Sequence, residues 1–477
     1  MPESEETCVT PSGGRPATLG ELRASGWRDR PVKEEIRANA ARRIAEGRPL
    51  VEGVLGYSET VLPDLERAIL AGHDLILLGE RGQAKTRIMR SLVGLLDEWI
   101  PVVAGSEIND NPFAPVSTFA REQIAQLGDE TPIDWRHRDR RYTEKLATPD
   151  TSIADLIGEV DPIKVAEGRY LADESTLHFG LVPRANRGIF AINELPDLSE
   201  RIQVGLLNVL EERDVQVRGY TVRLPLDLVL VASANPEDYT NRGRIITPLK
   251  DRFGSQVRTH YPHSAADELA VVHQEAEPLA LDGLQAVVPS FLADVVVSLT
   301  HLGRKSPNLN QRSGLSVRLT IANYEVLQAA AARRALKLDT TDACARPSDL
   351  PSLLAATAGK VEIEALEESR EGEVLERLLR SAVLAVWKER VPPAKLRGVI
   401  TEFEAGGTFE VGDDLPDSSY TKQLAGLPEL RAVAVDIAEQ ESAAHVASAA
   451  EFVLEGLHLS KRLNKDTGRR AASTYRA

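Results

Sequence analysis

The chain has 477 residues, of which 42% are hydrophobic and 27% charged, as is ordinary for soluble globular proteins. This length is enough for two or three domains, each with its own core. The formal net charge of −15 argues against a surface that neutralises nucleic-acid phosphates, so we do not expect nucleic acid as a partner. Only Cys8 and Cys344 occur, which excludes a disulfide framework and a zinc-binding spacing.

The first residues do not resemble a targeting segment. The stretch MPESEETCVTPSGG is acidic and lacks the basic-then-apolar order of a signal peptide. No stretch approaches the roughly 18 uninterrupted apolar residues of a membrane-spanning helix. We therefore expect a soluble, cytoplasmic protein with no membrane contact. Residues 1–50 are predicted to be an N-terminal extension, disordered over 1–16 and helical from Pro31 to Glu46.

Residues 51–262 alternate short apolar runs with helical patterns. Because the runs are almost continuously apolar, they predict parallel strands that are covered by helices on both faces. The fold class is therefore α/β, with a doubly wound nucleotide-binding core. The runs are Asp74–Leu78, Ile100–Ala104, Gly188–Ile192, Val229–Ala232 and Gln256–Thr259.

After Pro262 the composition becomes rich in Ala, Leu, Glu and Arg, with helical periodicity. We predict an α-helical lid domain over 263–395 and a C-terminal helical region of unknown role over 396–477. The predicted helices are 265–276, 287–303, 316–337, 362–390 and a long one near 429–456.

The sequence GERGQAKT follows the first apolar run and precedes a helical pattern. Strand, glycine-bearing turn and helix form the context of a phosphate-binding loop, in which backbone N–H groups and the helix N-terminus face the phosphates. Lys85 would reach the β- and γ-phosphates of ATP, and Thr86 would offer its hydroxyl to Mg²⁺. Ala84 stands where the pattern has glycine; alanine disfavours positive φ, so the loop must hold this residue in an allowed conformation. The loop residues are Gly79, Glu80, Arg81, Gly82, Gln83, Ala84, Lys85 and Thr86.

The run GIFAINE ends in Asn193 and Glu194. P-loop ATPases usually have Asp-Glu there, the Asp in the magnesium shell and the Glu polarising the attacking water. Asn193 can accept a hydrogen bond from a magnesium-bound water but carries no charge, whereas Glu194 can act as the base. Binding is thus better supported than fast hydrolysis, and Asn193→Asp is predicted to speed it. Alternatively, the pair only ends a core strand.

The next apolar run ends in Asn235, whose side chain could orient the lytic water or could merely open the turn with Pro236. Upstream, a helix over 198–211 leads to DVQVRGYTVRLP, which predicts a β-hairpin around Gly219-Tyr220. Such a hairpin is either a moving part or an edge decoration.

Two arginines are candidates for sensing the γ-phosphate. Arg252, in DRF, could point across a subunit interface at a neighbour's nucleotide, although other cations compete for that role: Arg242, Arg244 and Lys250. Arg318 opens a helix in SGLSVRLTIANYEVL and could reach back to the nucleotide. Each is otherwise an ordinary surface arginine.

Three stretches together resemble the AAA+ superfamily, within it the magnesium chelatase I-subunit and MoxR-like group. They are VLGYSETVLPDLERAILAGHDLILLGERGQAKT, then VVAGSEINDNPFAP with DLIGEVDPIKVAEGRYLADESTLHFGLVPRANRGIFAINELPDL, and then LLNVLEERDVQVRGYTVRLPLDLVLVASANPED with PLKDRFG. The resemblance covers about 51–330 and includes a helix-2 insert around 160–180. Ala-Lys-Thr is the loop ending typical of MoxR-like members, whereas Asn193 departs from both subfamilies.

The resemblance implies residue roles and partners. Lys85 and Thr86 take the Walker A positions, and Asn193 and Glu194 take the Walker B positions. Tyr57 stands on the adenine side, and the sensor 1, arginine-finger and sensor 2 positions fall on Asn235, Arg252 and Arg318. The cofactors implied are ATP and Mg²⁺. The resemblance also implies a homo-oligomeric, hexameric ring and a partner with a von Willebrand factor A domain.

Three functions remain open from the sequence. The first is a ring ATPase that remodels or activates a client protein, of which a magnesium chelatase motor is a narrower version. The second, favoured by Asn193, is a nucleotide-gated assembly scaffold with little or no hydrolysis. The third is a sigma-54-type transcription activator, which would need a GAFTGA-like loop and a helix-turn-helix that the sequence does not display.

Overall fold

The structure, a computed structural model, describes residues 14–160, 177–211, 215–217, 220–222, 224–236, 244–281, 283–310, 314–361, 371–467 and 472–477. Residues 1–13 of the predicted disordered stretch, and 161–176 of the predicted insert, lie outside these ranges. The chain forms two compact units, one of residues 1–79 and 84–259, the other of residues 80–83 and 260–477. Among the described residues, we find no helix with both the length and the apolar composition needed to cross a bilayer.

The first unit is built on a five-stranded sheet in the order β11-β1-β10-β7-β4, and every neighbouring pair is parallel. Smaller antiparallel pairs are β2–β3, β5–β6 and β8–β9. The strands are β1 (Leu75–Leu78), β2 (Trp99–Val103), β3 (Ile133–His137), β4 (Tyr142–Leu146), β5 (Gly158–Val160), β6 (Leu177–Phe179), β7 (Gly188–Asn193), β8 (Val215–Val217), β9 (Tyr220–Val222), β10 (Leu228–Ala234) and β11 (Ser255–Arg258).

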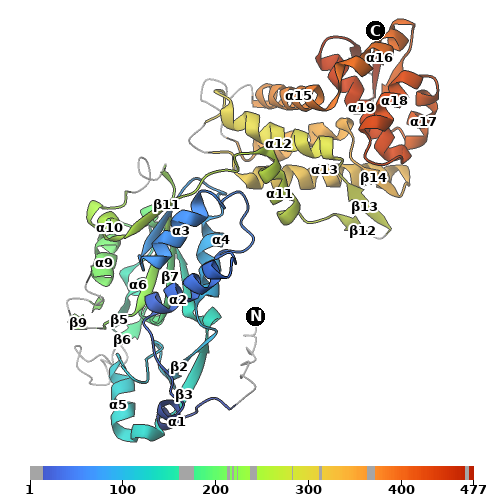
Figure 1. Ribbon diagram of the computed structural model, residues 1–477. Helices are drawn as coiled ribbons and strands as arrows, with labels where there is room; N and C mark the ends of the chain where they lie inside the picture. Colours follow the sequence, from blue (N-terminus) through green and yellow to red (C-terminus); the bar gives the residue numbers. More distant parts are fainter. Residues whose placement is uncertain are drawn as a thin grey trace. The chain divides into compact units, whose positions relative to one another are not determined.

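Helices cover both faces of this sheet. Alternate strand residues point to opposite sides, so Leu75 and Leu77 join one buried cluster with α2, α3 and α4, whereas Ile76 and Leu78 join another with α9 and α10 (Figure 1). The helices are α1 (Leu19–Ala24), α2 (Val32–Ala45), α3 (Val61–Leu70), α4 (Lys85–Ser91), α5 (Thr118–Leu127), α6 (Ile153–Leu156), α8 (Leu181–Arg184), α9 (Glu200–Glu211) and α10 (Thr247–Arg252), with short 3₁₀ turns η1 (Leu92–Leu95), η2 (Gly128–Glu130), η3 (Arg138–Arg141) and η5 (Leu195–Asp197).

One sequence prediction about this sheet is wrong, and one of its strands was not predicted. The run Ile100–Ala104 was expected in the parallel sheet, but β2 pairs antiparallel with β3 instead. The edge position is taken by β4, whose residues are mostly half-buried and polar, so no apolar run marked it. The parallel, doubly wound core itself is confirmed.

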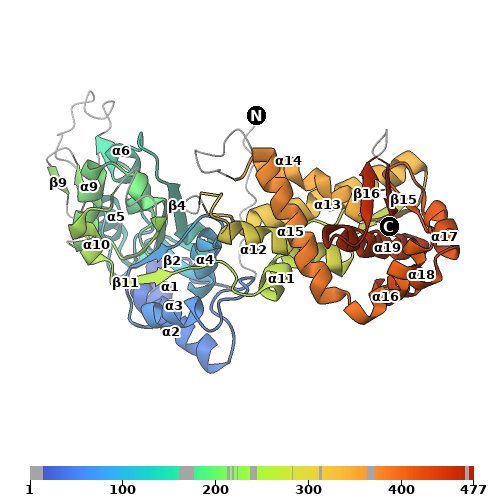
Figure 2. The same ribbon diagram turned by 90° about the horizontal axis from the view of Figure 1, so that it is seen from above.

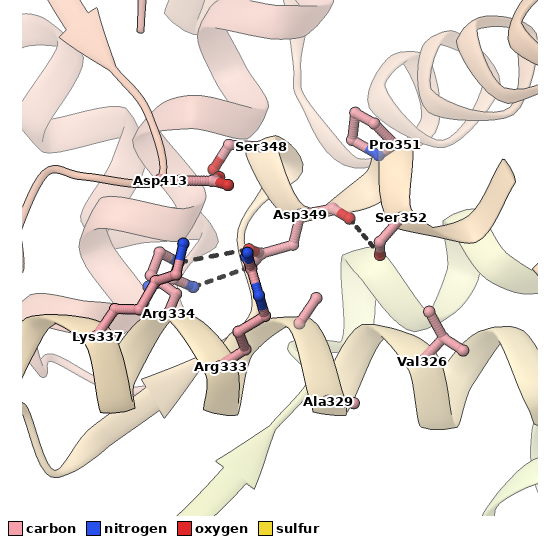
Figure 3. Close-up of a pocket in the computed structure, with 11 residues that line it drawn as sticks. Val326, Ala329, Arg333, Arg334, Lys337, Ser348, Asp349, Pro351, Ser352 and Asp413 are labelled. Carbon is pink, nitrogen blue, oxygen red and sulfur yellow. Dashed lines mark hydrogen bonds and ion pairs between the residues drawn. The ribbon is translucent and has the colours of Figure 1, made fainter. Parts of the chain in front are cut away.

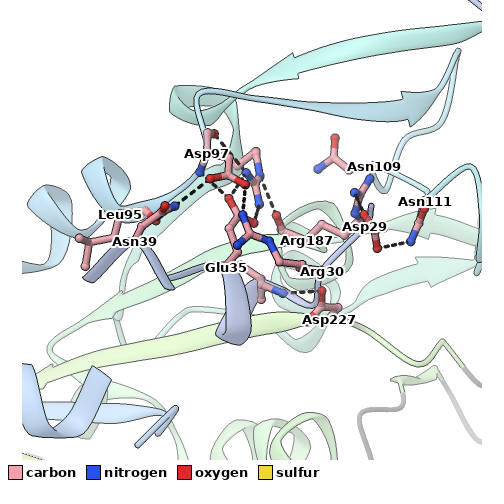
Figure 4. Close-up of polar contacts among 12 residues, drawn as sticks. Asp29, Arg30, Glu35, Asn39, Leu95, Asp97, Asn109, Asn111, Arg187 and Asp227 are labelled. Atoms are coloured by element: carbon pink, nitrogen blue, oxygen red, sulfur yellow. Dashed lines mark hydrogen bonds and ion pairs between the residues drawn. The ribbon is translucent and has the colours of Figure 1, made fainter. Parts of the chain in front are cut away.

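Helix α2 is bonded into the core through a buried polar network (Figure 4). The Arg141 guanidinium donates to both carboxylate oxygens of Glu35 on α2, at 2.8 and 2.7 Å, and both side chains are almost fully buried. Asn39 donates to Asp97 at 2.8 Å and to the Leu95 carbonyl at 2.9 Å. Residues of the predicted N-terminal extension therefore pack as part of the first unit.

The second unit is mainly helical and has two three-stranded sheets that we did not predict, β12-β13-β14 and β15-β17-β16. Its helices are α11 (Ala265–Glu275), α12 (Ser290–Lys305), α13 (Val317–Leu338), α14 (Leu353–Ala358), α15 (Glu371–Arg390), α16 (Leu396–Glu404), α17 (Asp417–Ala425), α18 (Pro428–Ile437) and α19 (Ala443–Leu459), with η7 (Pro347–Ser352) and η9 (Pro393–Lys395). Its strands are β12 (Ala280–Leu281), β13 (Leu284–Val287), β14 (Asp342–Cys344), β15 (Phe409–Val411), β16 (Asn464–Thr467) and β17 (Ser473–Arg476).

One hydrophobic cluster joins α12, α13, α15, α18 and α19, and α17 and α18 pack against α19 (Figure 2). The regions 263–395 and 396–477 share this core, and their division into domains stays a proposal. The single helix predicted near 429–456 is wrong. The region forms two helices, α18 and α19, joined by a short non-helical segment. The Ser442 side chain caps the N-terminus of α19 by accepting a hydrogen bond from the His445 backbone N–H.

Candidate functional site

The candidate site lies where three parallel strands end side by side. Leu78 at the end of β1 is paired with Ala234 of β10, and Ala232 of β10 is paired with Ile192 of β7. Because all three strands are parallel, the residues that follow them meet at one edge of the sheet, where ligands bind in open α/β sheets. The Gly79 amide donates to the Ala234 carbonyl at 3.1 Å, which continues the β1–β10 ladder into the loop.

The loop turns tightly before α4. Gly82 has a φ of +75°, and Ala84, the N-cap of α4, has a φ of +55° in the left-handed region. Ala84 therefore lies at positive φ, which alanine disfavours, in the small left-handed region that is allowed to residues other than glycine. The turn into α4 needs this conformation whichever residue occupies the position, and an alanine adopts it at an energetic cost that glycine avoids.

Lys85, the first residue of α4, is buried, and its ammonium is held by two acceptors of the sheet edge. It donates to the Gly79 carbonyl and to Asn235 Oδ1, the latter at 2.7 Å. The Asn235 amide in turn donates to Glu194 Oε2 at 2.6 Å. The cation, the amide and the carboxylate thus form one hydrogen-bonded chain across the ends of β1, β10 and β7.

Asn193 is not part of these hydrogen bonds from Lys85 to Glu194 and lies next to Thr86. Its Oδ1 accepts from Thr86 Oγ1 at 3.3 Å and from Ser233 Oγ at 3.2 Å. Ser233 Oγ also accepts from the Glu194 amide at 3.1 Å. Glu194 has a φ of +56°, an uncommon conformation for a residue with a side chain and one that occurs often at functional sites.

The residues at this edge fit a Mg²⁺ site. Mg²⁺ prefers oxygen ligands, keeps several waters, and is usually bound through one or two protein oxygens together with phosphates. The Thr86 hydroxyl and the Asn193 amide oxygen lie 3.3 Å apart. Glu194, the residue after Asn193, adds a carboxylate. With Lys85 beside them, these groups combine metal-binding oxygens with a cation for phosphate oxygens.

Sequence reasoning missed one residue of this arrangement. Glu144 lies on β4, and its Oε1 accepts from Asn193 Nδ2 at 2.5 Å. Arg90 on α4 donates to both Glu144 oxygens, at 2.8 and 3.0 Å, and the Tyr142 hydroxyl donates to Oε2 at 3.1 Å. Burial acts to raise the pKa of Glu144, but these hydrogen bonds and the Arg90 charge outweigh it, so the pKa is lowered. No motif marks this residue, because β4 has no apolar run.

The other predicted site residues are carried by other elements of the chain. Arg252 ends α10 with an exposed side chain, its Nη1 4.0 Å from the neighbouring Asp251 carboxylate. Arg318 is an exposed residue in the first turn of α13, in the second unit. Tyr57 is buried before α3 in the same cluster as α2 and α4. Arg242 and the hairpin turn at Gly219 lie outside the described residues.

A separate pocket of about 400 Å³ lies in the second unit, beside α13 and η7 (Figure 3). Its cations include the exposed Arg333 and Lys337 and the buried Arg334. Arg334 donates to the Asp349 carboxylate at 2.8 Å and to the Cys344 carbonyl at 2.6 Å. The charge of the buried cation is therefore balanced within the protein, and we assign no ligand to this pocket.

Comparison with known proteins gives matches over part of the chain. The sequence is 31% identical over 206 residues to magnesium-chelatase subunit ChlI of Anabaena variabilis, which covers 43% of this chain and 57% of that protein. It is 29% identical over 206 residues to the chloroplastic magnesium-chelatase subunit ChlI-1 of Arabidopsis thaliana, covering 42% and 45%. The chain thus spans about half the length of the curated relatives it matches.

Two further comparisons are less extensive or less similar. A family model described as the sigma-54 interaction domain matches residues 165–252. A solved structure of the complex between subunits BchI and BchD of magnesium chelatase is 22% identical, covers 67% of this chain and 98% of that chain, and has a TM-score of 0.35. Over part of its length the chain is thus similar in sequence to magnesium-chelatase subunits and to the sigma-54 interaction domain, and it carries the phosphate-loop sequence on a parallel-sheet core.

Proposed function

We propose that the chain is a Mg-ATP-binding and hydrolysing subunit of an AAA+ ring that remodels or activates a partner protein, as in the magnesium chelatase I and MoxR-like group. The observation that carries this proposal is the hydrogen-bonded chain Lys85–Asn235–Glu194, with Thr86 and Asn193 beside it. A strand end with a purely structural role would not need these groups, because burying a lysine ammonium costs free energy. In other proteins, side chains of these types bind phosphates and metal ions.

In this proposal each side chain has a stated task. Lys85 binds the β- and γ-phosphates, and the backbone amides of Gly79–Ala84 face the phosphate oxygens. Thr86 and Asn193 hold the metal side, where Mg²⁺ would offset the negative charge that develops on the phosphates. Glu194 polarises the attacking water, and Asn235 keeps the Glu194 carboxylate aimed by donating to it.

The remaining roles concern neighbouring copies and partners. Exposure of Arg252 on α10 supports a finger that acts on the nucleotide of the next subunit in a hexameric ring. Arg318 at the start of α13 would report the nucleotide state to the helical unit. The curated relatives are named as subunits of a larger enzyme, which supports a multi-subunit assembly. We propose a protein with a von Willebrand factor A domain as the partner, in the cytoplasm.

Turnover tests the proposal. Purified protein with Mg-ATP is expected to release phosphate, and Lys85→Ala should abolish that release, because it removes the cation that binds the phosphates. Phosphate release that persists unchanged in Lys85→Ala would contradict the proposed site. The matched control is Lys33→Ala. Lys33 is half-buried and forms an ion pair with Asp74, which precedes the other end of strand β1.

The scaffold function is the second candidate, and Asn193 favours it, since an amide brings no negative charge to the metal side. It predicts that Mg-ATP binds and drives assembly while phosphate release stays near the background rate. The match to the sigma-54 interaction domain spans the region from the insert to Arg252. This is the stretch that holds Asn193, Glu194 and Asn235, the part common to AAA+ proteins, so it does not favour a transcription activator over a client-remodelling ATPase.

A further inference from the structure

The Glu144 carboxylate occupies an unusual place behind the metal side of the site. It lies on β4, the strand next to β7, and four donors surround its two oxygens: two from Arg90, one from Tyr142 and one from Asn193. The side chain is 20% exposed. A charged acid is therefore held within hydrogen-bond distance of the residue that occupies the Walker B aspartate position.

This contact fixes which way the Asn193 amide points. An ionised carboxylate only accepts hydrogen bonds, so the atom of Asn193 that lies 2.5 Å from Glu144 is the Nδ2 donor. The carbonyl oxygen must then face the opposite side, where Thr86 and Ser233 donate to it. A half-turn of the amide would place two acceptors against each other at Glu144 and an NH₂ group against the metal side.

We propose that Glu144 is a positioning residue for the metal side of the nucleotide pocket, and that it supplies from β4 the carboxylate charge that Asn193 lacks. In the usual arrangement the acid itself lies on the metal side, whereas here the amide of Asn193 lies there. The Glu144 carboxylate accepts a hydrogen bond from that amide, whose oxygen faces Thr86. This inference rests on the proposed function, because it concerns how Mg-ATP is held.

The proposal reverses the expectation for one substitution. From sequence alone, Asn193→Asp should speed hydrolysis by restoring the usual acid. With Glu144 in place, that change removes the hydrogen bond that position 193 donates to Glu144 and puts two carboxylates in contact. The two carboxylates repel each other, so the side chain at position 193 no longer points its oxygen toward Thr86. The double variant Glu144→Gln/Asn193→Asp restores one acid and one amide, now with the acid on the metal side.

Nucleotide binding in Mg²⁺ and in EDTA tests this proposal. We would titrate a fluorescent, non-hydrolysable ATP analogue into the wild type, Glu144→Gln, Asn193→Asp and the double variant. In EDTA the four proteins should bind alike, because Lys85 and the loop are unchanged. In Mg²⁺ each single variant should bind about 10–100-fold more weakly than the wild type, the usual effect of losing a residue that orients a metal ligand. The double variant should bind more tightly than either single variant.

The outcomes separate this inference from the proposed function. If the wild type binds with Mg²⁺ but the double variant is no tighter than the single variants, Glu144 only anchors Arg90 and the inference is overturned. If Asn193→Asp alone binds as tightly as the wild type in Mg²⁺, the inference is also overturned. If the wild type shows no binding in either condition, the proposed function fails as well.

Folding is checked separately. Thermal unfolding of each variant without nucleotide shows whether it is folded, and Glu122→Gln, an exposed acid on α5, serves as the control. A purely structural role for Glu144 predicts equal weakening in EDTA and in Mg²⁺, whereas the positioning role predicts weakening in Mg²⁺ alone. Should Asn193→Asp not fold, the wild type, Glu144→Gln and the double variant still decide, because the double variant must bind more tightly than Glu144→Gln.

Discussion

Two residues with side chains hold the left-handed backbone conformation at the candidate site, Ala84 with a φ of +55° and Glu194 with a φ of +56°. Each lies at the point where a strand or loop changes direction, into α4 after the phosphate loop and into η5 after β7. The left-handed region costs a non-glycine residue roughly 1–2 kcal/mol. The surrounding hydrogen bonds, such as the one from the Glu194 amide to Ser233, offset this cost.

Substitution at Ala84 tests the strain. Glycine adopts this conformation freely, so Ala84→Gly should leave stability unchanged or raise it by up to about 1 kcal/mol. A β-branched residue is strongly disfavoured there, so Ala84→Val should lower stability by about 1–3 kcal/mol. Urea unfolding measures both. The control is Ala71, which is exposed at a φ of −73°, where a change to glycine should only destabilise. Equal stability of the valine and glycine variants at position 84 would contradict the backbone account.

At the scale of elements, one buried acid joins three helices of the second unit. Glu268 on α11 is fully buried and accepts from Arg304 on α12 at 2.6 and 3.0 Å and from Thr320 on α13 at 2.6 Å. It also lies 2.7 Å from His301 Nε2. Burial acts to raise the pKa of Glu268, but the hydrogen bonds from these three partners and the Arg304 charge outweigh it, and the pKa is lowered.

A lowered pKa in the folded state gives a defined pH dependence. The stability that Glu268 contributes is fully present above the unfolded-state value of about 4.3, and it is lost as pH falls through the lower folded-state value. Glu268→Gln should cost about 3–5 kcal/mol of folding stability at neutral pH, because it leaves the largely buried Arg304 without its acid. The difference from the wild type should shrink in acid.

Urea unfolding measures this difference at neutral pH and at a pH below the ordinary pKa of glutamate side chains. The exposed acid Glu277, changed to Gln, is the matched control and should show no such pH dependence. If the difference in the free energy of unfolding between the wild type and Glu268→Gln stays constant or increases in acid, the pKa of Glu268 is not lowered.

The elements that could be predicted from sequence are those buried on both faces. The strands β1, β7 and β10 are almost continuously apolar because helices cover both sides, and such a run is easy to recognise. The edge strand β4 reads YTEKL and is half-buried, so nothing in its pattern distinguishes it from a loop. For β2 the apolar run was found, but its partner was wrong, because strand pairing depends on contacts between residues distant in sequence.

The candidate site follows the same division. Asn193, Glu194 and Asn235 were found from sequence because they lie at the ends of recognisable strands, and Lys85 and Thr86 because they end a recognisable glycine-bearing loop. The structure brings these five residues together. Glu144 could not be found in this way, because its importance comes only from the pairing of β4 with β7. The left-handed conformation of Ala84 was also missed, since it is imposed by the turn and not by the residue.

At the scale of the whole molecule, the proposed ring places each active site between two copies of the chain. Glu194 would act within its own subunit, and the exposed Arg252 would act on the neighbour. A closed ring of identical subunits repeats this one interface around its circumference. Each of the two residues is therefore needed at every site but can come from a different copy.

Mixing inactive variants tests this sharing. Arg252→Ala and Glu194→Gln subunits should each be inactive alone, yet about a quarter of the interfaces in an equal, random mixture combine an intact Glu194 with a neighbour's Arg252. Phosphate release should then reappear in the mixture, with a maximum near equal proportions. Arg201→Ala, which changes an exposed arginine on α9, is the control for a general loss of positive charge. If no mixing ratio restores activity, Arg252 does not act across an interface.

The central claim is that the edge of the parallel sheet binds Mg-ATP through the Lys85 ammonium. Isothermal titration calorimetry of Mg-ATP into the wild type and into Lys85→Ala tests it most directly, with the Lys33→Ala variant as a control for the loss of a partly buried lysine. We expect saturable heat for the wild type and for Lys33→Ala, and none for Lys85→Ala at the same concentrations. Absence of heat for the wild type at millimolar Mg-ATP, or an unchanged isotherm for Lys85→Ala, would contradict the account.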